Sequence, residues 1–319
     1  AFLKRGHYDR DIGEGAFFPV MTKVTGALYW TLDPNVCCAC KARIFKECHG
    51  KVLPDGFRRQ RLMLATDGSE FSRAPTDIAV TLARRFGVTL DVVAAVESEA
   101  DRDRARARLA SATRDAHIAG VDTEEIIRIG RQPAKEVAAA AATADTNLLV
   151  IGRRPPRGDF KEKLVGDIAR NIVTRADCHV LIAGWQATMW RQRILIASDG
   201  SPFSDSVAEL ALQIAKVTTT PVTILTIAGN GLSHDDAAED ARHKAGTMQL
   251  EGVACEIRVA DGNPGAAIVA AATELGADLV VVGHRRRKLS ATVEHVVGHL
   301  ACAVLLVNAP DRGPLAEDL

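Results

Sequence analysis

The 319-residue chain has few aromatic side chains, which make up 4% of it, and no net charge, since 40 basic residues balance 40 acidic ones. This balance argues against a general electrostatic attraction to nucleic acid or to an anionic membrane. The seven cysteines, an odd number, show no disulfide framework, and the sequence shows no signal peptide. We therefore expect a cytoplasmic protein in a reducing compartment, with no nucleic-acid partner.

The common catalytic signatures are also missing. The sequence contains no Walker lysine motif, no Gly-x-Ser-x-Gly elbow and no His-Glu-x-x-His. His295 and His299 are spaced for a metal pair on one helix, but no third ligand is near them in sequence, so surface or capping histidines are the plainer interpretation. Cys178, Cys255 and Cys302 precede or lie in apolar strands and are expected to be buried thiols. The sequence predicts a protein that is not an enzyme.

The most informative stretch occurs twice. Residues 61–69 read RLMLATDGS and residues 193–201 read RILIASDGS, so that Asp67 and Asp199 lie 132 positions apart. A run that is apolar on both faces predicts a buried strand, and Asp-Gly-Ser before a helical pattern predicts a tight turn at its carboxyl end. Ligands of open parallel sheets bind at the carboxyl ends of the strands. The two aspartates are therefore candidates for turn formation or for orienting a ligand.

The repeat indicates three segments, an N-terminal arm (1–58), domain 1 (59–184) and domain 2 (193–309). Each domain alternates five apolar strands with four helices, which predicts parallel βα units with right-handed crossovers. The expected strands are 61–66, 88–96, 124–129, 148–151 and 179–183 in domain 1, and 193–198, 221–227, 254–260, 278–282 and 303–307 in domain 2.

The duplicated pattern resembles the universal stress protein family in its tandem, two-domain form. The resemblance rests on the Asp-Gly-Ser-x-x-Ser turns, the glycine-to-proline turn before the third helix of each domain, and the strand endings LLVIGRR and LVVVGHR. It covers residues 59–309 and implies two α/β domains, each with a five-stranded parallel open sheet in the order 3-2-1-4-5 and helices on both faces. It further implies a pseudo-dimer in which strands 179–183 and 303–307 lie side by side and antiparallel.

Many members of that family bind ATP or AMP through Gly-x-x-Gly, nine residues and Gly-Ser or Gly-Thr, with the first-strand aspartate near the nucleoside. Domain 1 departs from this signature. Gly152 occupies the first glycine position, but Pro155 occupies the second, where Gly158 is a partial replacement, and Gly166 is followed by Asp167 instead of a hydroxyl residue. Proline lacks an amide donor, and a carboxylate at a helix amino end repels phosphate.

Domain 2 departs further, because Ser290 lies only seven positions after Gly283, whereas Gly166 lies fourteen positions after Gly152. Its basic run, residues 285–288, is more consistent with a solvated loop than with a site for an anion or an acidic partner. We therefore expect degenerate nucleotide sites and a non-enzymatic regulatory or scaffolding subunit. The alternative is an ATP- or AMP-binding stress sensor that uses domain 1.

The arm contains an apolar stretch, residues 15–32, that is nearly long enough to span a bilayer. Pro19 and Lys23 argue against a lipid-exposed span, so the sequence predicts no transmembrane segment. The stretch is expected to pack on the protein itself, to bind a partner protein or a second copy, or to make a peripheral membrane contact.

Four of the seven cysteines lie in the arm. Cys37, Cys40 and Cys48 are spaced for a zinc-type site, with His49 or Cys38 as the fourth ligand. An iron–sulfur cluster is a further possibility, and a set of reduced structural thiols is the alternative to any metal.

Overall fold

The computed structural model describes residues 61–154, 166–229, 231–285 and 288–309, and the backbone of two short strands in the arm. The chain divides into two compact units, Ala1–Cys48 and His49–Leu319. In the first unit, β1 (Val20–Val24) and β2 (Ala27–Thr31) form an antiparallel hairpin, which the sequence pattern did not predict. The proposed metal ligands, Cys37, Cys38, Cys40, Cys48 and His49, lie outside the described residues.

Domain 1 follows the predicted alternation of strands and helices. Its strands are β3 (Arg61–Ala65), β4 (Thr89–Val96), β5 (Thr123–Ile129), β6 (Leu148–Arg153) and β7 (His179–Gly184). Its helices are α2 (Arg73–Phe86), α3 (Arg102–Ile118), α4 (Pro133–Thr143) and α5 (Asp167–Val173). Two short 3-10 turns, Glu70–Ser72 and Glu99–Asp101, precede α2 and α3.

Domain 2 repeats this order. Its strands are β8 (Ile194–Ser198), β9 (Val222–Ile227), β10 (Cys255–Ala260), β11 (Leu279–His284) and β12 (Ala303–Asn308). Its helices are α6 (Pro202–Thr218), α7 (His234–Leu250), α8 (Pro264–Leu275) and α9 (Ala291–His299).

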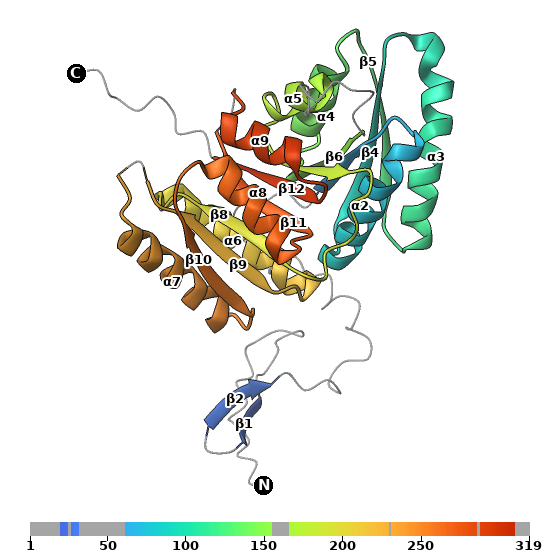
Figure 1. The fold of residues 1–319 in the computed structure, drawn as a ribbon. Helices are drawn as coiled ribbons and strands as arrows, with labels where there is room; N and C mark the ends of the chain where they lie inside the picture. The colour runs from blue at the N-terminus through green and yellow to red at the C-terminus, as the bar shows by residue number, and fades with distance from the viewer. Residues whose placement is uncertain are drawn as a thin grey trace, which may run out of the picture. The chain divides into compact units, whose positions relative to one another are not determined.

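The strands of both domains form a single ten-stranded sheet in the order β10-β9-β8-β11-β12-β7-β6-β3-β4-β5. Within each half the strands are parallel and follow the predicted order 3-2-1-4-5. The halves meet where β12 pairs antiparallel with β7, with Leu305 opposite Leu181. The expected pseudo-dimer is confirmed, and the two predicted sheets are joined into one (Figure 1).

Helices cover both faces of the sheet because its strands are apolar on both sides. One core lies between the sheet and α2, α3, α6 and α7, and the other lies under α4, α5, α8 and α9. Trp190, in the linker between the domains, is fully buried in the first core. None of the helices in the described part of the chain is both long and apolar enough to cross a membrane.

An Asp-Gly-Ser turn follows the carboxyl end of β3 and of β8, as the sequence predicts. Helices at this edge of the sheet begin at residues suited to a helix start. Pro202 lies in the first turn of α6, where its missing amide costs no hydrogen bond. Ser290 caps α9 through its side-chain oxygen, which accepts a hydrogen bond from the Val293 amide at 3.2 Å. Local sequence thus fixes where the turns and helix starts lie at this edge of the sheet.

Candidate functional site

The turn after β3 is organised by the Asp67 carboxylate. Its Oδ1 accepts hydrogen bonds from the Ser69 amide at 3.0 Å and the Ser72 hydroxyl at 2.9 Å, and its Oδ2 pairs with the Arg154 guanidinium. Burial alone raises the pKa of Asp67, but the hydrogen bonds from Ser69, Ser72 and Arg154 outweigh it and hold the pKa well below its usual range. Asp67 is therefore ionised and already bound by the protein's own groups.

Helix α3 lies directly against this turn at Gly68. Gly68 has a φ of +67°, and a Cβ atom built on it would lie 2.4 Å from Arg108 Cβ and 2.9 Å from the Arg108 carbonyl oxygen. Only glycine satisfies both the left-handed backbone and this close approach. Arg108 itself is exposed at the surface of α3. The turn of domain 1 is therefore flanked by two arginines, one from the end of β6 and one from α3.

Two neighbouring arginines at the end of β6 make contacts in different domains. Arg154 pairs with Asp67, whereas Arg153 donates hydrogen bonds to the carbonyls of Val297 and Leu300 at the end of α9 in domain 2. Burial lowers the pKa of Arg153. A cation at the carboxyl end of a helix interacts favourably with the helix dipole, so Arg153 links the domain 1 turn region to the second domain.

The structure places the remaining predicted residues of domain 1 as follows. Gly152 follows the buried part of β6 and faces Pro75, whose Cγ would lie 3.2 Å from an added Cβ. Gly166 precedes α5, where an added Cβ would meet none of the described residues within 4 Å, and Asp167 is the first residue of that helix. Gly158 lies outside the described residues. The structure thus connects Asp67 with the end of β6, and the part that Gly166 and Asp167 play in a site stays a prediction.

The turn after β8 is closed by apolar side chains. Asp199 accepts a hydrogen bond from the Ser201 amide at 3.0 Å, the same turn-forming bond that Asp67 makes. Gly200, with a φ of +71°, would place a Cβ atom 2.9 Å from Leu232 Cδ2, and Gly283 would place one 2.8 Å from Phe203 Cε1. The space beside both glycines is therefore filled by side chains of domain 2.

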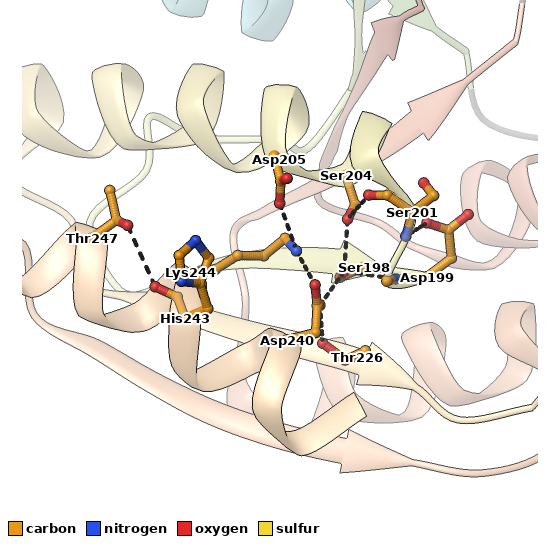
Figure 2. Close-up of polar contacts among 11 residues, drawn as sticks. Ser198, Asp199, Ser201, Ser204, Asp205, Thr226, Asp240, His243, Lys244 and Thr247 are labelled. Atoms are coloured by element: carbon orange, nitrogen blue, oxygen red, sulfur yellow. Dashed lines mark hydrogen bonds and ion pairs between the residues drawn. The ribbon is translucent and has the colours of Figure 1, made fainter. Parts of the chain in front are cut away.

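A partly buried ionic cluster lies under α7, next to the domain 2 turn (Figure 2), with its Asp205 side chain 63% exposed. The Lys244 side chain is 3% exposed, and its Nζ contacts Asp205 Oδ1 at 2.9 Å and Asp240 Oδ1. The other Asp240 oxygen accepts hydrogen bonds from the Ser198 hydroxyl at 2.8 Å and the Thr226 hydroxyl at 3.1 Å. The cluster joins α6 and α7 to the ends of β8 and β9, so it holds the helices to the sheet where the turn begins.

This cluster has no counterpart in domain 1. At the positions 132 residues earlier, Arg73 replaces Asp205, Arg108 replaces Asp240 and Ala112 replaces Lys244. The repeated sequence motifs do not include the residues of this cluster, because these residues lie outside the Asp-Gly-Ser turns. The sequence does carry a signal for them. Asp240 and Lys244 are spaced four residues apart, as an ion pair on one helix would be, whereas the other copy has arginine and alanine at these positions.

Within the described residues no group of three or more histidines, cysteines or carboxylates is arranged to hold a metal. His295 and His299 stack with their ring centroids 3.9 Å apart, and His299 Nδ1 lies 2.8 Å from the His295 carbonyl oxygen.

The expected burial of the thiols holds fully for Cys178, while Cys255 and Cys302 are half-buried. Burial raises the pKa of both half-buried thiols to about 11, which makes them weak nucleophiles.

The family model for "Universal stress protein family" matches residues 58–184 and 191–308. The chain belongs to the universal stress protein family. Both halves of the sheet match it separately, which agrees with the internal repeat and with the tandem arrangement.

Solved structures share the tandem fold at low identity. A universal stress protein from Archaeoglobus fulgidus DSM 4304 is 20% identical, with 79% of this chain and 97% of that chain covered at a TM-score of 0.65. A putative universal stress protein from Pseudomonas aeruginosa UCBPP-PA14 is 16% identical, with 80% and 95% covered at 0.63. The cytoplasmic domain of a prokaryotic cation chloride cotransporter is 13% identical, with 79% and 97% covered at 0.52. No protein with a curated description matches the chain.

Proposed function

We propose that the chain is a non-enzymatic tandem universal stress protein that acts as a regulatory or scaffolding subunit and whose two nucleotide sites are degenerate. The observation that carries this proposal is the way in which the protein's own side chains occupy both Asp-Gly-Ser turns. Asp67 is bound by Arg154, while Leu232 and Phe203 fill the space beside the domain 2 glycines. A ligand at either turn would have to displace these groups.

The phosphate end of each turn supports the same conclusion. In domain 2, the Ser290 hydroxyl caps α9 by accepting a hydrogen bond from the Val293 amide, and it lies only seven positions after Gly283. The connection is too short to wrap a triphosphate in the manner of the longer family loop. In domain 1, the carboxylate of Asp167 begins α5 and complements the helix dipole where a phosphate would bind.

The charged groups near the turns are used internally. The Lys244 ammonium is enclosed by Asp205 and Asp240 and is nearly inaccessible to solvent, so a substrate does not reach it. Arg153 is engaged by carbonyls of domain 2. These contacts support a structural role for the charges rather than an acid–base or nucleophilic one.

The second candidate function is a sensor that binds ATP or AMP at domain 1. One observation favours it: the side chains of Asp67 and Arg154 are 42% and 54% exposed, so their ion pair lies at the surface. Surface ion pairs contribute only about 0–1 kcal/mol, and a ligand can exchange with one at little cost. Gly152 is also retained at the first glycine position.

Isothermal titration calorimetry with ATP and with AMP, each with Mg²⁺, tests both functions. We expect no binding at domain 2 and weak binding at most at domain 1, and the double variant Pro155→Gly/Asp167→Ser should strengthen ATP binding. Asp67→Ala and the matched Asp199→Ala assign any signal to one domain. Tight ATP binding that Asp199→Ala removes would refute the degenerate-site proposal, and tight binding that Asp67→Ala removes would favour the sensor.

We further propose that the arm makes the main partner contact and holds zinc through Cys37, Cys40, Cys48 and either His49 or Cys38, in a cytoplasmic protein. Elemental analysis of protein prepared without chelator tests the metal, and freely reactive thiols with no metal would remove it. Deletion of residues 1–50 tests the contact. The partner protein should no longer co-purify, while both domains stay folded.

A further inference from the structure

The ten-stranded sheet ends at β5 on one side and β10 on the other. In the described part of the chain, each of these strands pairs with one neighbour only, β5 with β4 and β10 with β9. An edge strand carries unpaired amides and carbonyls that template pairing with another chain, and proteins usually protect such edges with charged side chains.

The backbone groups that β10 turns outward can be assigned. The carbonyls of Ala254 and Ala260 accept hydrogen bonds from the β9 side at 2.9 and 2.8 Å. Because successive residues of a strand direct their backbone groups to opposite sides, the amides and carbonyls of Cys255, Ile257 and Val259 face away from β9. A second strand placed at this edge would therefore bond to these three residues.

The two edges differ in their protection. Glu125 of β5 lies opposite Val92, and Ile257 of β10 lies opposite Ile224, the residue that matches Val92 in the repeat. Glu125 thus places an exposed charge where β10 carries Ile257, a large apolar side chain that is 38% exposed. Leu250, at the end of α7, is 90% exposed. The edge of domain 2 is apolar at the position where the edge of domain 1 is charged.

The sequence of β10 is also self-complementary. If two copies of β10 pair antiparallel about Ile257, Glu256 lies opposite Arg258 of the second copy, and Cys255 lies opposite Val259 of the second copy. The outward backbone groups of both strands then meet in hydrogen-bonded pairs. Opposite charges in directly opposed positions stabilise an antiparallel pair by about 0.2–1 kcal/mol each.

We infer that two copies of this protein associate through β10, antiparallel and with the two-fold axis at Ile257, to form a C₂ homodimer with a continuous sheet. The chain already uses such a junction once, between β7 and β12. Glu256 and Arg258 also pair with Arg193 at 2.6 Å and Glu274 at 2.8 Å in their own chain, so the new contacts extend an alternating row of charges. This inference is independent of nucleotide binding.

Analytical ultracentrifugation of the full chain across micromolar concentrations is the first test. The wild-type protein should be a dimer, and Ile257→Glu, which copies the charge of the β5 edge, should make it monomeric. The matched control Ile118→Glu, at an exposed apolar residue beside the other edge, should leave the dimer intact. A monomeric wild-type protein, or a dimer that survives Ile257→Glu with an unchanged circular dichroism spectrum, would overturn the proposal.

Cross-linking tests the register. In hydrogen-bonded antiparallel pairs the Cα atoms are about 5.5 Å apart, which suits a disulfide. Val259→Cys should therefore cross-link to Cys255 of the second copy under copper–phenanthroline oxidation, and most chains should run as dimers on a non-reducing gel. Adding Cys255→Ser should abolish that band. A dimer in solution that gives no such cross-link would show that the strands do not pair as proposed.

Discussion

Leu181 of β7 and Leu305 of β12 lie directly opposite each other at the centre of the antiparallel junction between the domains. Neither side chain is accessible to solvent. The Arg153 guanidinium, which caps α9 from the other domain, adds a polar contact across the same junction. The halves therefore share one core at this point, and a defect there should affect both.

We predict that Leu181→Ala lowers the unfolding free energy by about 2–5 kcal/mol, because it deletes buried atoms from a close-packed site. Both domains should lose stability in one cooperative urea transition. The control Leu250→Ala removes an exposed side chain and should change stability by no more than about 0.5 kcal/mol. Separate transitions for the two halves, with only domain 1 destabilised, would contradict the shared junction.

The Lys244 cluster gives a second prediction. Lys244→Met should destabilise domain 2 by about 3–5 kcal/mol, because Asp240 is left as an unpaired and largely buried carboxylate. Adding Asp240→Asn should recover part of that loss. Lys216→Met, which breaks the solvent-accessible pair with Glu251, is the control and should cost about 0–1 kcal/mol. Equal effects of the two lysine variants in thermal and urea denaturation would show that the cluster contributes little.

The acid side of the stability profile should depend on His179. Burial lowers the pKa of His179 to about 4, whereas the unfolded chain titrates near 6.5. The unfolded state therefore binds more protons between these values, and the unfolding free energy falls as the pH drops from about 6.5 to 4, by at most about 3 kcal/mol. His284, whose pKa burial also lowers, acts with the same sign.

The contribution of Asp67 lies at lower pH. Its folded pKa is depressed, so its stabilisation is present above the unfolded value of about 3.9 and is lost below it.

Urea denaturation of the wild-type protein and of His179→Gln at pH 7 and pH 5 isolates the contribution of His179. The variant should lose less stability between the two pH values, and equal losses would exclude His179 as a cause.

Much of the fold follows from local patterns. Apolar runs such as 193–198, closed by turn residues, define strands whatever packs on them. The strand order and the β7–β12 junction were expected from the resemblance to the family, not from these runs. The contacts that define the site do not follow in this way. That Arg154 reaches Asp67, or that Leu232 covers Gly200, depends on the path of a loop and on where a helix lies over the sheet. Sequence spacing carries no information on either.

The last prediction compares two glycines with the same backbone handedness and different surroundings. Gly68 has a φ of +67° and Gly252 a φ of +80°, but an added Cβ meets Arg108 at 2.4 Å in the first case and nothing within 4 Å in the second. Alanine at either position would have to adopt a left-handed backbone conformation, which lowers the unfolding free energy by about 1–2 kcal/mol. At Gly68 the nearest atoms include the Arg108 backbone, so α3 itself must shift.

Gly68→Ala should therefore be more destabilising than Gly252→Ala by about 1–3 kcal/mol, the usual cost of overpacking. Urea denaturation of the two variants measures the difference directly, because the backbone term is common to both and cancels. Hydrogen exchange should show the added loss of protection in α3 for Gly68→Ala alone. Equal unfolding free energies for the two variants would mean that α3 does not press on the Asp-Gly-Ser turn, and that the turn of domain 1 is more open to a ligand than the structure indicates.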